Sequence, residues 1–146
     1  MDYPPLVVLD TEDDYRSHYE ALFCRKPIVT CDGIEVRFRK RDFDHAFFES
    51  VLSKDDTFSR KRAERMDWIK AALQDPSAER FVGWNQKRNR YDHRRHVIVV
   101  QRNYVVVVVI TGKKSGKFIT AYVADTPARP GRASTIDQIR GGPKWT

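Results

Sequence analysis

Apolar side chains recur at helical spacing in three segments of the first half of the chain. The pattern predicts one helix over about residues 12–23, a second that begins at Asp42, and a third over about residues 58–73. Asp75-Pro76 ends the third helix, because the residue before a proline avoids helical geometry. The three apolar stripes contain Tyr15, Tyr19, Leu22 and Phe23, then Phe43, Ala46, Phe47 and Val51, then Met66, Ile69 and Leu73.

Period-two alternation and uniformly apolar runs predict strands in the other segments. Two short strands flank Asp32-Gly33, which is a strong signal for a tight hairpin turn. The run from Val105 to Ile110 shows no alternation, so we expect a central strand that is covered on both faces. The predicted strands, of which the last four form a meander, span residues 27–31, 34–38, 78–84, 95–101, 104–111 and 117–124.

Together these elements predict an α+β domain over residues 1–126. The N-terminal helices are expected to pack on one face of an antiparallel meander sheet of four or more strands. A chain of 146 residues with 40% apolar side chains is long enough to bury one core. Residues 127–146 are rich in proline and glycine, which predicts a C-terminal tail, and we expect this tail to pack back on the domain at Trp145.

The last predicted strand carries hydroxyl groups on one face. If Ile119, Ala121 and Val123 point into the core, alternation places the other side chains of the strand on the opposite face. These other side chains are Phe118, Thr120 and Tyr122. A face with two hydroxyls and an aromatic ring suits a phosphodiester, although threonine and tyrosine are also ordinary strand residues.

Positive charge is the main compositional signal. The chain has a net charge of +7 and a sequence pI near 9.6, and its basic residues cluster at 37–41, 60–65 and 87–96. Basic side chains mixed with aromatic ones are typical of nucleic-acid binding, whereas the alternative is a solvated basic face. The residues predicted to bind RNA are Lys40, Arg41, Arg88, Arg90, Tyr91, His93, Arg94 and Arg95.

The sequence shows no pattern typical of a disulfide scaffold, a metal site or a membrane span. Cys24 and Cys31 are too few for a disulfide scaffold and match no common zinc spacing, so we expect them to be reduced. His93 and His96 lie among arginines that repel a cation, and we predict neither a metal site nor a cofactor. The longest apolar run is far shorter than the roughly 20 residues of a membrane span, which predicts no membrane association and a cytoplasmic location, or delivery to a target cell by a non-classical route.

Metal-independent RNA cleavage requires only the residue types that remain. The ribose 2′-hydroxyl attacks the adjacent phosphate, so the site must move protons and stabilise negative charge. His45 is the best candidate for proton transfer, because it is off the apolar stripe of a helix that follows the basic segment 37–41. Arg37 and Arg39, with Thr120 and Tyr122, are the candidate phosphate ligands. The alternative for His45 is a solvated helix residue paired with Asp44 or Glu49.

The order of elements resembles the phage and bacterial nucleases grouped as barnase-EndoU-colicin-RelE-like. The resemblance covers about Val36 to Asp125 and is carried by residues 43–45, 65–70, 73–76, 104–110 and 118–122. It implies metal-independent ribonuclease activity and a toxin held off by a partner protein, here an acidic antitoxin or immunity protein. By the same likeness His45 matches the family's histidine and Thr120 its late-strand hydroxyl, while the basic residue is Arg37, Arg39 or Arg94.

The sequence therefore predicts a toxin-like endoribonuclease with RNA as its substrate. Two other functions fit the same basic face. One is a non-catalytic module that binds RNA or DNA, and the other is a phage- or secretion-associated domain that binds an acidic protein.

Overall fold

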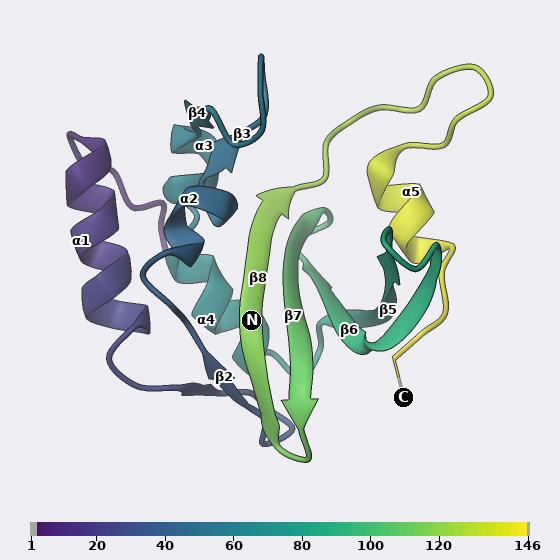
Figure 1. Ribbon diagram of the computed structural model, residues 1–146, viewed down its shortest axis with the longest axis horizontal. Helices are drawn as coiled ribbons and strands as arrows, with labels where there is room; N and C mark the ends of the chain where they lie inside the picture. The colour runs from purple at the N-terminus through teal and green to yellow at the C-terminus, as the bar shows by residue number, and fades with distance from the viewer. Residues whose placement is uncertain (1–2, 146) are drawn as a thin grey trace.

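The computed structural model describes residues 3–145, so residues 1, 2 and 146 of the predicted domain and tail lie outside the described residues. The chain is α+β, with a six-stranded sheet in the order β1-β2-β8-β7-β6-β5 and a separate β3-β4 hairpin (Figure 1). The helices are α1 Glu12–Phe23, α2 Asp42–Ala46, α3 Arg60–Ala63, α4 Asp67–Gln74 and α5 Thr135–Arg140. The strands are β1 Ile28–Val29, β2 Glu35–Arg37, β3 Phe48–Glu49, β4 Thr57–Phe58, β5 Glu79–Asn85, β6 Arg90–Val100, β7 Tyr104–Gly112 and β8 Ser115–Val123.

The meander accounts for only part of the sheet. Strands β5 to β8 are antiparallel neighbours in chain order. Strand β2 extends the sheet by pairing in parallel with β8, where Val36 lies opposite Gly116, so the prediction of a purely antiparallel meander is wrong. The β1-β2 hairpin covers the backbone of β8, which would otherwise be an unpaired sheet edge.

The helices contribute to two separate cores. Buried side chains of α1 to α4 pack in one cluster with Ile98, Val106 and Phe118 of the sheet. Ile136 and Ile139 of α5 pack in the other cluster, which includes Val97 and Val105. Figure 1 shows α5 beside β5 and β6, away from the other helices. The prediction that helices cover one face is therefore incomplete, because the uniformly apolar β7 needs cover on both faces, and α5 supplies part of it.

The segment between α2 and α4 differs from its prediction. Helix α2 ends at Ala46, and the chain then forms the β3-β4 hairpin, in which Phe48 pairs with Phe58. Val51 is 68% exposed and does not belong to an apolar stripe. The predicted third helix is divided into two. Ser59 caps α3, which ends at Ala63, and α4 begins at Asp67. The second predicted helix is therefore shorter than expected: Phe43, Ala46 and Phe47 are buried, whereas Val51 lies in the hairpin loop.

A β-bulge changes the direction of the side chains in β8. Val107 pairs with Thr120 and Val108 pairs with Phe118, which leaves Ile119 as the extra residue. Phe118 is consequently fully buried in the helix-side core, and Ile119 packs against the opposite cluster. The faces of the strand that the sequence predicted for Phe118 and Ile119 were therefore wrong. Beyond the bulge, Ala121 packs on the helix side, and Tyr122 packs with Ile119 against the opposite cluster.

The C-terminal tail contacts the outer strand of the sheet. The Trp145 amide donates a hydrogen bond to the Arg80 carbonyl over 3.0 Å, and the Val82 amide donates to the Pro143 carbonyl over 2.8 Å. The Trp145 ring stacks on His96 at a centroid distance of 4.1 Å. Among the helices in residues 3–145, none is long and apolar enough to cross a membrane.

Candidate active site

A cavity of about 1120 Å³ lies over the face of the sheet that carries Thr120. It is bounded by α2, the β3-β4 loop, the β5-β6 hairpin, α5 and the middle of strands β6 to β8. Its lining includes the cationic or titratable side chains of His45, Lys54, Lys87 and Arg95. Within the described part of the chain, no aspartate or glutamate lines the cavity. The cavity is therefore suited to an anionic ligand.

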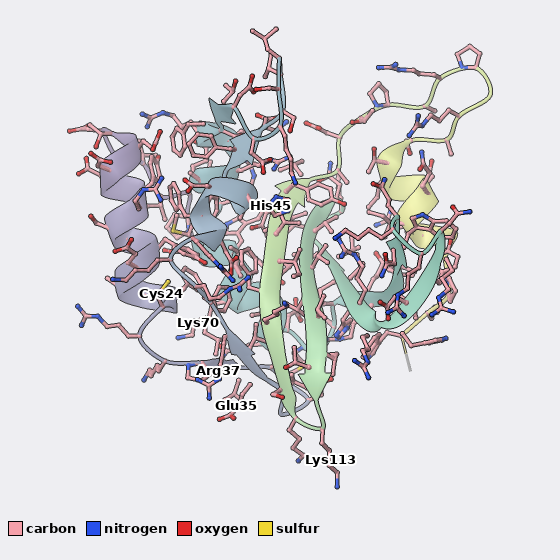
Figure 2. All side chains as sticks on the ribbon, in the orientation of Figure 1. Cys24, Glu35, Arg37, His45, Lys70 and Lys113 are labelled. Carbon is pink, nitrogen blue, oxygen red and sulfur yellow. The ribbon has the colours of Figure 1, made fainter. Side chains whose placement is uncertain are left out.

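His45 enters the cavity from α2, a helix that packs against β8. Figure 2 labels His45 beside the upper part of β8. Its Nδ1 lies 3.2 Å from Oδ2 of Asp55, and the two side chains are 49% and 25% exposed. A carboxylate at Nδ1 fixes the orientation of the ring and stabilises the imidazolium form, which leaves Nε2 for a ligand. The sequence predicted Asp44 or Glu49 as the alternative partners, but Asp44 pairs with Arg16 over 2.7 Å.

The β3-β4 loop holds Asp55 in position. Asp56 accepts hydrogen bonds of 2.9 Å from the amides of Val51, Leu52 and Ser53, and these bonds hold the pKa of its carboxyl well below the usual range. Asp55 itself has a φ of 50°, a left-handed conformation that is uncommon for residues other than glycine. The loop is thus ordered by its own hydrogen bonds, and it presents Asp55 to His45.

Strand β8 contributes Thr120 and Tyr122 to the cavity. The Arg62 guanidinium lies 5.8 Å from the centre of the Tyr122 ring. Burial raises the pKa of Tyr122, and the positive charges of Arg95 and Arg62 offset part of this increase. Tyr122 therefore keeps its proton at neutral pH and can act as a hydrogen-bond donor.

Arg95 reaches the cavity because of a bulge and a glycine. Val82 pairs with His96 and Gly83 pairs with Asp92, so residues 93–95 are extra residues in β6. A Cβ atom on Gly83 would lie 2.6 Å from Cγ and 2.8 Å from Cδ of Arg95, which is closer than van der Waals contact permits. Glycine at this position lets the Arg95 side chain lie across β5. Among the described residues Arg95 forms no ion pair, so its charge is available to a ligand.

The structure brings some of the predicted residues together and separates others. His45, Thr120 and Tyr122 line one cavity, together with Tyr91 and Arg95 from the predicted RNA-binding set. The other predicted residues lie elsewhere, and these are Arg37, Arg39, Lys40, Arg41, Arg88, Arg90, His93 and Arg94.

Of the two arginines predicted to hold phosphate, neither lines the cavity. Arg37 is exposed and lies opposite Lys117 at the beginning of β8, and Figure 2 shows it at the end of the sheet away from His45. Arg39 forms an ion pair with Asp42 over 3.0 Å, and its carbonyl accepts a hydrogen bond from Tyr19. Arg39 therefore connects β2, α2 and α1.

The remaining predicted residues are mostly exposed. Lys40 lies 3.9 Å from Glu20, and Arg41 precedes α2. Arg88, Arg90, His93 and Arg94 are exposed on the β5-β6 hairpin beside the cavity. They can contribute long-range attraction for a polyanion at the rim of the cavity.

Sequence reasoning missed Asp55 and Trp84, and it placed Arg95 among the RNA-binding residues but not among the catalytic ones. Ser53, Asp55 and Asp56 form a cluster of turn-forming residues, which could have indicated a loop in place of a continued helix. Gly83 within an otherwise regular strand is a signal for a bulge or a close approach. No local signal indicates that these residues share one cavity.

His96 is separate from the cavity. It is buried beneath Trp145, and burial together with the charge of Arg80 lowers its pKa to about 4. Its Nε2 and the Nη1 of Arg80 are buried without a hydrogen-bond partner among the described residues. His96 therefore contributes to the attachment of the tail.

No group of three or more histidine, cysteine, aspartate or glutamate side chains in residues 3–145 is arranged to hold a metal ion.

Comparison of the chain with protein-family models, with curated proteins and with solved structures gives no match. The chemistry of the cavity is therefore the basis for assigning a function.

Proposed function

We propose that the protein is an endoribonuclease that cleaves RNA without a metal ion, in the cavity that contains His45. One observation carries the proposal. A histidine paired with a carboxylate, a strand hydroxyl, a protonated tyrosine and an arginine all face a cationic cavity. These groups supply the proton transfer and the charge stabilisation that phosphodiester cleavage requires.

In the proposed reaction His45 is the general base. Its Nε2 takes the proton from the ribose 2′-hydroxyl, and O2′ then forms a bond to phosphorus. The bond between phosphorus and O5′ breaks, so the products are a 2′,3′-cyclic phosphate and a free 5′-hydroxyl. Asp55 stabilises the imidazolium that forms, because its carboxylate lies 3.2 Å from Nδ1.

Arg95 and the two β8 hydroxyls act on the phosphate. The Arg95 guanidinium can bind two phosphate oxygens at once, so it stabilises the charge of the pentacovalent transition state. Thr120 donates a hydrogen bond to a non-bridging oxygen. Tyr122 donates its proton to the leaving O5′, which is far more basic than a phenolate, and takes a proton back from water before the next turnover.

By its resemblance to the barnase-EndoU-colicin-RelE-like nucleases, the protein is further proposed to be a toxin. Such a protein would act in the cytoplasm, either of its own cell or of a cell to which it is delivered by a non-classical route. A cavity lined by Lys54, Lys87 and Arg95 complements an acidic antitoxin or immunity protein that competes with RNA.

The test is cleavage of total RNA in the presence of EDTA. The wild-type protein should cleave, and His45→Ala should be slower by about 100-fold or more, which is the usual contribution of a general base. His18→Asn is the matched control, because His18 also pairs with a carboxylate, Asp67 at 2.8 Å, but lies on α1. Retained RNA binding without cleavage by the wild-type protein would instead identify a binding module.

A further inference from the structure

Two large aromatic side chains are exposed beside the proposed reaction centre. Trp84 is 45% exposed and Tyr91 is 40% exposed, and both line the cavity that contains His45. Their ring centres are 5.1 Å apart and the rings are nearly perpendicular, at 87°. Two adjacent, partly exposed rings offer a ligand an apolar surface of defined geometry.

The β5-β6 hairpin fixes the positions of both rings. Trp84 and Tyr91 are directly opposite residues in the strand pairing. The Asn85 side chain donates to Asp92 over 3.2 Å and accepts from the Arg88 amide over 3.3 Å, which ties the turn together. The rings are therefore carried by ordered backbone, and little conformational entropy is lost when a ligand binds them.

The C-terminal tail supports Tyr91 from one side. A Cβ atom on Gly142 would lie 3.1 Å from Cε1 and 3.2 Å from the hydroxyl of Tyr91. The tail backbone thus lies directly against this ring and restricts its motion. The return of the tail to the sheet, through Pro143 and Trp145, contributes to the site.

The surroundings of the rings are basic. Lys87 lines the same cavity, and Arg88 and Arg90 are exposed on the same hairpin. Aromatic faces next to cationic side chains bind nucleic acid by stacking with the bases and by attraction of the phosphates. A base has a free face for stacking only where the strand is unpaired.

We propose that Trp84 and Tyr91 form a nucleobase-binding subsite that holds an unpaired base of single-stranded RNA next to the scissile phosphate. This inference rests on the proposed function for the choice of RNA. It assigns the substrate class, because a duplex does not offer the unstacked base that the two rings bind.

Binding of an RNA that cannot be cleaved tests the subsite separately from catalysis. A fluorescent single-stranded oligonucleotide with 2′-O-methyl groups has no free 2′-hydroxyl, so its dissociation constant is independent of activity. Trp84→Ala and Tyr91→Ala should each weaken binding by about tenfold or more. Leu22→Ala is the control, because Leu22 is 53% exposed on α1 and should leave binding unchanged.

The dependence of binding on salt distinguishes stacking from charge. The two aromatic variants should keep the wild-type slope of affinity against salt concentration, whereas Lys87→Ala should reduce the slope by about one. The same strand annealed into a duplex should bind more weakly than the single strand. Circular dichroism of each variant confirms that the fold is retained.

The outcomes separate the two proposals. If the wild-type protein does not cleave RNA but binds the oligonucleotide, and Trp84→Ala weakens this binding, the ribonuclease proposal is refuted and the subsite is supported. Affinities of both aromatic variants within twofold of wild type, or tighter binding of the duplex, refute the subsite whether or not the protein cleaves RNA. Tight binding of single-stranded DNA but not of the 2′-O-methyl RNA also refutes it.

Discussion

Nδ1 of His45 lies 3.2 Å from Oδ2 of Asp55, although the two residues belong to different elements and are separated by the β3 strand. The Asp55 carboxylate orients the ring, which lines a cationic cavity, and stabilises a positive charge on it. This relationship makes His45 a better candidate for proton transfer than an isolated surface histidine.

Substitution of Asp55 should reduce catalysis more than it reduces binding. Asp55→Asn removes the carboxylate that stabilises the imidazolium, so we expect kcat to fall by about 10- to 100-fold with KM nearly unchanged. Steady-state kinetics of RNA cleavage by the variant and by the wild-type protein measures both constants. A kcat of Asp55→Asn equal to that of the wild-type protein would exclude Asp55 from the mechanism.

Substitution of Gly83 should act through Arg95. Gly83→Ala places a methyl group 2.6 Å from the present position of Arg95 Cγ, so we expect the guanidinium to leave the cavity and RNA cleavage to fall by about tenfold or more. The measurement is a double-mutant cycle with Arg95→Ala. If Gly83→Ala acts through Arg95, it should have little further effect in the Arg95→Ala protein. Fully additive losses would contradict this account.

Removal of the Tyr122 hydroxyl should lower kcat without unfolding the protein. Tyr122→Phe keeps the ring that packs against the apolar cluster containing Val105 and Val107, so stability should be nearly unchanged. The proposed donation of a proton to O5′ is lost, and we expect kcat to fall by about 100-fold or more. A substrate with a more acidic leaving group, such as a nitrophenyl phosphodiester, should restore much of the rate. Equal losses with both substrates would show that Tyr122 does not protonate the leaving group.

The buried His96 should make the protein less stable in acid. Its pKa lies near 4 in the folded protein against an ordinary value of 6.5, so the unfolded chain binds the additional proton. Stability should therefore be highest above pH 6.5 and fall as the pH decreases towards 4, by about 3 kcal/mol in total from this residue.

The control for His96 is a variant that keeps the stacking. His96→Phe retains a ring against Trp145 but does not titrate, so urea unfolding at pH 7 and pH 4 should show a smaller loss of stability than in the wild type. Asp32 and Arg80, whose charges act on His96, are present in both proteins. Equal losses in the two proteins would show that His96 is not the cause.

Elements that depend on interactions between residues close in the chain were predictable from the sequence, and features that depend on tertiary contacts were not. Helix α1 was predicted with its bounds, because Thr11 and Asp14 form a capping box within four residues. The central position of β7 followed from its own composition. In contrast, the bulge at Ile119 depends on the pairing of β8 with β7, which no local pattern specifies.

The candidate site was predicted in part for the same reason. His45, Thr120 and Tyr122 were chosen for their chemistry and lie around one cavity. The choice of arginine depended on tertiary structure, because the chain has many basic residues and only the packing distinguishes them. Arg39 neutralises Asp42, whereas Arg95 is directed into the cavity by a bulge and by Gly83.

The most direct test of the central claim uses a DNA oligonucleotide that contains a single ribonucleotide. Mass spectrometry of the products, formed in EDTA, should show one cut on the 3′ side of the ribonucleotide and a 2′,3′-cyclic phosphate on the upstream fragment. His45→Ala should reduce the rate at which this product forms by about 100-fold or more. No cleavage of the oligonucleotide by the wild-type protein, or cuts at deoxyribonucleotides, would contradict cleavage by the 2′-hydroxyl in this cavity.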